Sequence, residues 1–322
     1  MAASCSVDGA WHARHDNGTL SAHELAGYWC TRNELLRTRL GDMTPHRAEW
    51  LCAYDAHERR RHRAALQFEW RTRDCGPAQL IAQLFEALRG RSILLVGDSL
   101  TLQHFVSLFC MLRRHVVVQH MWRFELSHGG AVEFAPSDYL VQRAPHGGFD
   151  RQLRLRKRDA TIHLQFLGEP NPRFDRAWAA RLRHDVLVLN TGGHWSPNDL
   201  AGYAAAAKAV MRHLRQYRGM VFYRTLQGVA GCGDLEDVPP GAADGWTAFP
   251  AFDAVWHSLA PRHGLRILNV STSTRADGHC ERCYRASRHV RDCLHGCLPG
   301  PVDAWAMVLG GALTAAFRQT VA

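Results

Sequence analysis

The stretch SILLVGDSLTLQHFVSLFCML, residues 92–112, decides the fold. It opens with an aliphatic run, ending at Val96, of the kind found in strands that are buried on both faces. Gly97, Asp98 and Ser99 follow, and apolar residues then recur at helical spacing, at Leu102, Phe105, Val106, Phe109 and Leu112. The stretch therefore predicts a strand, a tight turn and a helix, with Ser99 at the sheet edge where open α/β proteins bind their ligands.

The rest of the central sequence alternates short aliphatic runs with helical patterns, which is typical of a parallel sheet covered by helices on both faces. We expect strands at 92–96, 115–119, 161–166, 185–189, 219–223 and 265–270, and an earlier helix at 78–88. The segment 121–152 has Gly129-Gly130 between two alternating runs and predicts an inserted hairpin. The predicted fold class is α/β, a three-layer α/β/α sandwich with a parallel sheet.

The sequence before residue 91 has a different character. Tryptophans and cysteines are spread there through polar sequence that is rich in histidine and arginine. We therefore predict a small, disulfide-linked N-terminal subdomain at 1–90, packed on a catalytic domain at 91–322.

The composition favours an oxidising compartment. The chain of 322 residues has ten cysteines, and it has N-glycosylation sequons at Asn17 and Asn269. No apolar run is long enough to cross a bilayer, so a lumenal protein would have its signal or membrane anchor outside this sequence. The net charge of +9 favours anionic partners, but no nucleic-acid motif surrounds the basic run 59–63, so we expect no nucleic-acid partner.

Ser99 is the candidate nucleophile. Its position at a helix start also places its own N–H group at the positive end of the helix dipole, where it could stabilise an oxyanion. The alternative is that Asp98 and Ser99 only cap the helix. Asp292 and His295 support catalysis, because a carboxylate three residues before a histidine can hold the imidazole tautomer that accepts the serine proton. Against this, the chain has 20 histidines, so the spacing can also arise by chance on the surface.

Two further residues are candidates for the oxyanion hole. Asn190 ends an expected strand and is followed by Thr191-Gly192-Gly193, where the backbone can approach a ligand closely. Its amide could donate to the oxyanion, although an Asx-turn that closes the strand would explain it equally well. Gly168, just after another expected strand, could donate its backbone N–H group.

The last cysteines admit a metal site as an alternative to disulfides. Cys280, Cys283, Cys293 and Cys297 could supply four thiolates, with His279 and His295 nearby. The irregular spacing and the six other cysteines favour disulfides, so no metal is expected.

Several motifs resemble the trichome birefringence-like proteins of plants and the PC-esterase group, polysaccharide O-acetyltransferases of SGNH fold. The similarity covers nearly the whole chain and includes a cysteine-rich leader. The similar motifs are Gly-Asp-Ser-Leu at 97–100, Ser-Leu-x-Cys at 107–110, Arg-x-Asp-x-His at 275–279, and Asp-Cys-x-His-x-Cys-Leu-Pro-Gly-x-x-Asp-x-Trp at 292–305. The family's Asn-Thr-Gly-His-Trp motif resembles residues 190–195, which contain one extra glycine. The chain departs from the family at Leu102-Gln103-His104, where plant members usually have Arg-Asn-Gln.

The resemblance implies a lumenal Golgi enzyme, usually held by an N-terminal membrane helix, that moves acetyl groups onto sugar hydroxyls. It would bind no resident cofactor but would need an acetyl donor, such as acetyl-CoA or another acetyl carrier, and a polysaccharide or oligosaccharide acceptor. His194 and Trp195 are candidates for contacting the sugar, because an indole face can stack on a sugar ring; the alternative is that Trp195 is a partly buried core residue. An esterase of the same fold and a glycan-binding wall protein without catalysis remain alternatives.

Overall fold

The computed structural model describes part of the chain. It comprises residues 5–14, 66–112, 117–118, 122–125, 131–134, 139–143, 149–157, 160–168, 182–227, 246–273 and 294–321. The predicted site residues Ser99, Gly168, Asn190 and His295 lie inside it. Asp292 lies outside the described residues.

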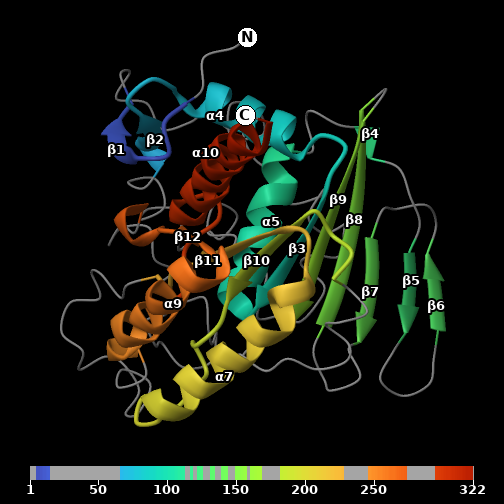
Figure 1. Cartoon of the computed structure of the whole chain (residues 1–322). Coiled ribbons are helices and arrows are strands. Elements are labelled where there is room, and N and C mark those ends of the chain that lie inside the picture. The colour runs from blue at the N-terminus through green and yellow to red at the C-terminus, as the bar shows by residue number, and fades with distance from the viewer. Residues whose placement is uncertain are drawn as a thin grey trace, which may run out of the picture.

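The centre of the molecule is a ten-stranded sheet with a parallel region, as the sequence predicts (Figure 1). Five parallel strands run across it in the spatial order β12-β11-β10-β3-β9. Their bounds are β3 (Ser92–Gly97), β9 (Ala160–Gly168), β10 (Val186–Asn190), β11 (Met220–Arg224) and β12 (Arg266–Leu268). The strand order reverses between β3 and β10, and ligands of open α/β sheets bind at such a switch point.

The other half of the sheet is antiparallel in large part, which the sequence did not predict beyond one hairpin. Strands β9 and β8 pair antiparallel because only residues 158–159 separate them in the chain, and such a short connection cannot make a parallel crossover. The predicted hairpin corresponds to the antiparallel pair β5 and β6. The remaining bounds are β4 (Val117–Val118), β5 (Trp122–Glu125), β6 (Ala131–Phe134), β7 (Tyr139–Arg143) and β8 (Phe149–Lys157).

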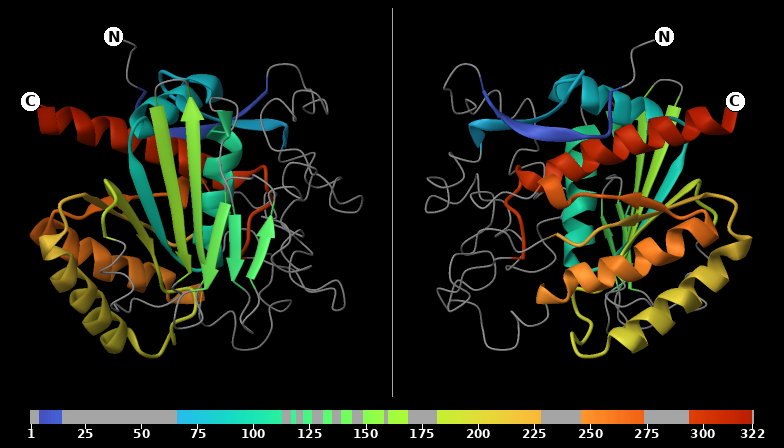
Figure 2. Two further views of the ribbon diagram at one scale, coloured as in Figure 1. Left: turned by 90° about the vertical axis from the view of Figure 1, so that its right-hand side faces the viewer. Right: turned by 60° about the vertical axis from the view of Figure 1, so that its left-hand side comes forward.

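Helices cover the parallel region in two groups (Figure 1, Figure 2). Helices α4 (Pro77–Leu88), α5 (Ser99–Leu112) and α10 (Pro301–Val321) contact one another, and α5 packs on β3 and β9. Helices α7 (Leu200–His213) and α9 (Phe249–His263) form the second group. Two 3-10 turns, η4 (Leu214–Gln216) and η6 (Ser271–Ser273), complete the described elements. The predicted helix at 78–88 and the helix after Ser99 are both confirmed.

Helix α5 is buried along nearly its whole length. Every residue from Leu100 to Leu112 is buried, and Ser99 is partly exposed. The sheet covers one side of the helix and α4 and α10 cover others, which explains why polar residues in α5 must find partners inside the protein.

The N-terminal part is joined to the α/β fold by several contacts. Strands β1 (Gly9–Ala13) and β2 (Phe68–Thr72) form a two-stranded antiparallel sheet, and a disulfide joins Cys5 to Cys75. The Trp11 Nε1–H group donates to the Ser273 carbonyl at 2.9 Å. Helix α4, which also precedes residue 91, packs directly on α10. The division into domains at residue 90 stays a prediction.

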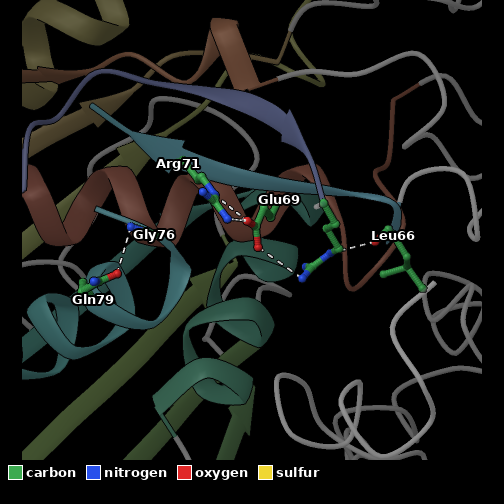
Figure 3. A network of polar contacts seen from close by, with 6 residues as sticks. Leu66, Glu69, Arg71, Gly76 and Gln79 are labelled. Atoms are coloured by element: carbon green, nitrogen blue, oxygen red, sulfur yellow. Dashed lines mark hydrogen bonds and ion pairs between the residues drawn. The ribbon is translucent and has the colours of Figure 1, made fainter. Parts of the chain in front are cut away.

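A nearly buried carboxylate in β2 links this strand to the residue that follows β1 (Figure 3). Glu69, 9% exposed, accepts from Arg71 and lies 3.2 Å from the Arg14 Nη1 atom. Arg14 also donates to the Leu66 carbonyl at 3.0 Å. Because both guanidinium groups are partly buried beside it, the Glu69 charge is compensated where water is scarce.

Candidate active site

Ser99 and His295 meet at the sheet edge although 196 residues separate them in the chain. The His295 Nε2 atom lies 2.7 Å from the Ser99 Oγ atom, which is hydrogen-bond distance. His295 is 3% exposed, whereas Ser99 is partly open to solvent. A serine hydroxyl paired with a buried imidazole in this way is the central element of a nucleophile and general-base pair.

The turn after β3 places Ser99 at the switch point between β3 and β10. Gly97 pairs in register with Gly168 of β9 on one side and with Asn190 of β10 on the other. A Cβ atom on Gly97 would collide with the Asn190 carbonyl oxygen and the Thr101 side chain, so only glycine allows these segments to approach so closely. The predicted oxyanion residues thus end neighbouring strands, immediately beside the turn that carries Ser99.

Asp98, not Ser99, caps helix α5. Its Oδ1 atom accepts from the Leu100 N–H group at 2.9 Å, and its carbonyl accepts from Leu102. The cap and the nucleophile are therefore separate residues, and the Ser99 hydroxyl is left for His295.

The loop after β10 also approaches Asp98 closely. A Cβ atom on Gly193 would meet the Asp98 Oδ2 atom, and Gly192 has a φ of 129°, which favours glycine. Both residues of the Gly-Gly pair therefore have a structural requirement for glycine. The close approach to Asp98 therefore explains why the loop has a glycine at its second position, Gly193.

The Asn190 side chain is fully buried and holds β11. Its Nδ2 group donates to the Arg224 carbonyl at 2.9 Å and lies 3.5 Å from the Thr225 carbonyl. Its Oδ1 atom accepts from the Arg224 Nη2 group at 2.6 Å. In this arrangement the amide hydrogens point at main-chain carbonyls, so donation by Asn190 to an oxyanion stays a prediction that requires the amide to leave these partners.

Arg224 is a buried cation beneath the site, which the sequence did not single out. Its guanidinium carbon lies 4.1 Å from the centre of the Trp305 ring, a cation–π contact. Burial lowers the pKa of Arg224 to about 10, opposed chiefly by the Asp98 charge. Burial, together with the Arg224 charge, holds the pKa of His104 well below its usual value. Arg224 therefore remains the cation of this region at neutral pH, while His104 is neutral.

Two buried glutamines bind the backbone on both sides of His295. Gln103 donates to the Gly296 carbonyl at 2.7 Å and accepts from the Gly296 N–H group at 3.3 Å. Gln227 donates to the Leu294 carbonyl at 3.1 Å. The sequence contained a signal for Gln103, because it lies four residues after Ser99 in the expected helix and so shares its face.

The predicted sugar-contacting residues lie in the loop after β10. His194 is exposed and Trp195 is partly buried. The Trp195 indole N–H group donates to the Asp199 carbonyl at 2.9 Å, and its ring packs edge-on against Tyr203 at 5.7 Å. Trp195 thus has a local packing role, and its sugar contact stays a prediction.

The cysteines of the described residues are oxidised. Cys5 pairs with Cys75, and Cys110 and Cys297 also take part in disulfides. Cys297 is therefore not available as a thiolate ligand, which removes one of the four ligands of the alternative zinc site. Cys280, Cys283 and Cys293 lie outside the described residues. Within the described ranges, no group of three or more His, Cys, Asp or Glu side chains could hold a metal ion.

Residues 80–229 and 254–311 match the family model named PC-Esterase, a GDSL/SGNH-like acyl-esterase family found in Pmr5 and Cas1p. The two matched segments together make up well over half of the chain. They include Ser99, Gly168, Asn190 and His295.

Three curated relatives show the extent of the similarity. Protein trichome birefringence of Arabidopsis thaliana is 24% identical over 79% of this chain, which spans 50% of that protein's length. Probable xylan O-acetyltransferase 11 of Oryza sativa subsp. japonica is 26% identical over 74% of both chains. Xyloglucan O-acetyltransferase 1 of Arabidopsis thaliana is 25% identical, covering 74% of this chain and 68% of its own.

A solved structure from Slackia heliotrinireducens that carries the name SGNH hydrolase is also similar. It has a TM-score of 0.37 and 15% identity, and the match covers 69% of this chain and 97% of that chain. In the part of the chain that the structure describes, no helix is both long and apolar enough to span a membrane.

Proposed function

Since this chain belongs to the PC-esterase family of GDSL/SGNH-like acyl-esterases, we propose that it moves an acetyl group through an acyl-serine intermediate onto a hydroxyl of a polysaccharide. The observation that supports this most is the 2.7 Å distance between the Ser99 Oγ and His295 Nε2 atoms at the switch point of the sheet.

The proposed first half-reaction forms the acetyl-serine. His295 Nε2 takes the proton of the Ser99 hydroxyl, and Ser99 Oγ attacks the acetyl carbonyl of the donor. The bond from the acetyl carbon to the donor's leaving group then breaks, and the leaving group takes the proton from His295. Asp292 would hold the imidazole in the required tautomer.

The second half-reaction returns Ser99 to its starting state. His295 takes the proton of a carbohydrate hydroxyl, and that oxygen attacks the acetyl-serine carbonyl. The Ser99 Oγ atom leaves and recovers its proton from His295. In both steps the negative charge on the acetyl oxygen would be stabilised by the backbone N–H groups of Ser99 and Gly168, with Asn190 as a further candidate. Gly168 pairs in register with Gly97, two residues before Ser99.

The acceptor is inferred from the relatives. Two of them are named for xylan and xyloglucan, so a neutral or substituted plant-type polysaccharide is the proposed acceptor class. The donor would be acetyl-CoA or another acetyl carrier. The oxidised cysteines support the secretory pathway, and we propose the Golgi lumen as the working compartment.

An esterase is the second candidate, because water attacking the same acetyl-serine gives acetate and free enzyme. The partly exposed Ser99 favours neither acceptor over the other. A glycan-binding protein without catalysis is the weaker alternative, since it has no need of a serine held at 2.7 Å from a buried imidazole.

One assay separates these functions. The disulfide-bonded protein is incubated with an acetyl donor and a panel of oligosaccharides, and mass spectrometry records acetylated sugar and free acetate. Acetylated sugar supports the transferase, acetate alone supports the esterase, and neither product from a folded protein supports the glycan-binding alternative. The Ser99→Ala variant is the control and should form neither product.

A further inference from the structure

We propose that Gln103 and Gln227 are positioning residues that hold His295 at its working distance from Ser99. This inference depends on the proposed catalytic pair and adds to it. The two glutamines bind the peptide groups before and after His295, and neither is assigned by the family resemblance.

Gln103 makes the more complete contact. Its side-chain amide donates to the Gly296 carbonyl and accepts from the Gly296 N–H group, so both polar atoms engage one residue. Gln103 is fully buried. One hydrogen bond donated to Gly296 and one accepted from it restrict both the distance and the orientation of the Gly296 peptide groups. They therefore fix the direction of the chain just after His295.

Gln227 secures the other side of the histidine. It donates to the Leu294 carbonyl at 3.1 Å and is 1% exposed. Its Oε1 atom is buried and has no hydrogen-bond partner among the described residues. Gln227 therefore fixes the main chain just before His295 through its amide donor.

Gln103 lies in the same helix as the nucleophile. We call the hydrogen bonds of Gln103 and Gln227 to the peptide groups on either side of His295 the glutamine clamp. Ser99 and Gln103 are four residues apart and therefore lie one above the other on the same face of one helix. The helix that carries the nucleophile thus also carries the group that holds the base. Ser99 and one of the two groups that hold the His295 segment are therefore fixed in the same buried helix.

Without these hydrogen bonds, the loop would allow the His295 ring to shift away from Ser99 during the reaction. A displacement of about 1 Å in a reacting group can lower a rate by about 10²-fold. We therefore expect Gln103→Ala to lower kcat for a small acetyl ester by about 10²-fold with little change in KM, and Gln227→Ala to lower it by about 10-fold, since it loses one bond instead of two. Labelling of Ser99 by an organophosphonate should slow in parallel.

A second variant tests positioning independently of a general loss of structure. In Gln103→Glu the protonated carboxyl group can reproduce both hydrogen bonds, whereas the carboxylate cannot donate to the Gly296 carbonyl. The ratio of its kcat to that of the wild type should be near one at low pH and fall as the pH rises through the pKa of the new carboxyl group. Taking the ratio at each pH removes the pH dependence that the two enzymes share. A ratio that is constant with pH would contradict the clamp.

The controls separate failure of the clamp from failure of the catalytic pair. Ser273→Ala removes a buried side-chain hydrogen bond to the Val270 carbonyl, away from the site. It should lower the melting temperature about as much as Gln103→Ala does, but it should keep the wild-type kcat. In a His295→Ala background, adding Gln103→Ala should lower the residual rate no further, because Gln103 acts through His295. If His295→Ala keeps full activity, the proposed function is wrong. If His295→Ala is inactive but folded Gln103→Ala has wild-type kcat, or if the double variant loses activity additively, only the clamp is wrong.

Discussion

The Ser107 hydroxyl donates to the Asp303 Oδ1 atom at 2.6 Å, two helical turns beyond Ser99 in α5. Ser99, Gln103 and Ser107 are each four residues apart, and each contacts the segment 295–303. These three residues form a polar stripe along helix α5, and this stripe docks the segment that contains His295. The nucleophile is the first residue of the stripe.

The buried carboxyl group of Asp303 should make stability depend on pH. It accepts from Ser107 and from the Gly300 N–H group, but burial raises its pKa from 3.8 to about 7. The folded protein thus holds the proton more tightly than the unfolded chain. The stabilising contribution is complete below pH 4 and is lost as the pH rises through about 7, by at most about 4 kcal/mol.

We expect Asp303→Asn to flatten this part of the pH dependence. The measurement is the free energy of unfolding by urea between pH 4 and 8 for both proteins. Asp253, whose pKa burial raises to about 6, acts in the same direction in both and cancels in the comparison. Parallel curves for wild type and variant would show that Asp303 does not titrate in this range.

Trp195 should matter more for transfer to a sugar than for release of acetate. Trp195→Ala is expected to lower acetylation of an oligosaccharide by at least about 10-fold while leaving hydrolysis of a small activated ester within about twofold, because only the sugar needs the aromatic face. Trp195→Phe keeps an aromatic face but loses the indole bond to Asp199, so it should retain most transfer. Equal losses in both assays, with Phe as damaging as Ala, would assign Trp195 to the packing of its loop.

The Cys5–Cys75 disulfide should stabilise the whole molecule. It closes a separation of 70 residues, for which chain entropy predicts about 4 kcal/mol, and both cysteines are part of the main core. Replacing both by serine should lower the unfolding free energy by a few kcal/mol, measured with urea under oxidising conditions. Because the Ser99 and His295 pair is built from other elements, kcat of the folded variant should change little. A loss of kcat at unchanged stability would contradict this division.

Asn269 should carry an N-linked glycan if the protein passes through the secretory pathway. Asn269 is exposed just after β12, and its Oδ1 atom accepts from the Ser271 N–H group at 3.0 Å and the hydroxyl at 2.7 Å. These contacts leave the Nδ2 group of the sequon as the accessible amide. Secreted protein should lose mass on glycosidase treatment, and Asn269→Gln should remove that part of the change. Asn17→Gln serves as the comparison for the other sequon.

The sequence by itself determined the elements whose signal is local. Residues 92–112 predicted β3 and α5, because an aliphatic run and a 3.6-residue repeat are properties of adjacent residues. The same reasoning placed β9, β10, β11, β12 and α4 within a few residues of their observed bounds. It also placed Ser99 at the sheet edge, and the Asp292-x-x-His295 spacing named the residue that meets it. Asp292 itself stays a prediction.

Only the tertiary structure decided the contacts that join distant segments. The antiparallel half of the sheet follows from the β8–β9 connection, and strand direction is not a property of strand composition. Arg224 and Gln227 look like ordinary polar residues in sequence, since hydrogen bonds across 34 and 67 residues leave no periodic trace. The spacing of Gln103 from Ser99 indicated a shared helix face, but not its partner Gly296, 193 residues away. The sequence offered two roles for Asn190, and the fold supplied its present partners because β10 and β11 lie side by side. Burial explains the difference, since polar groups removed from water must find partners wherever the fold brings them.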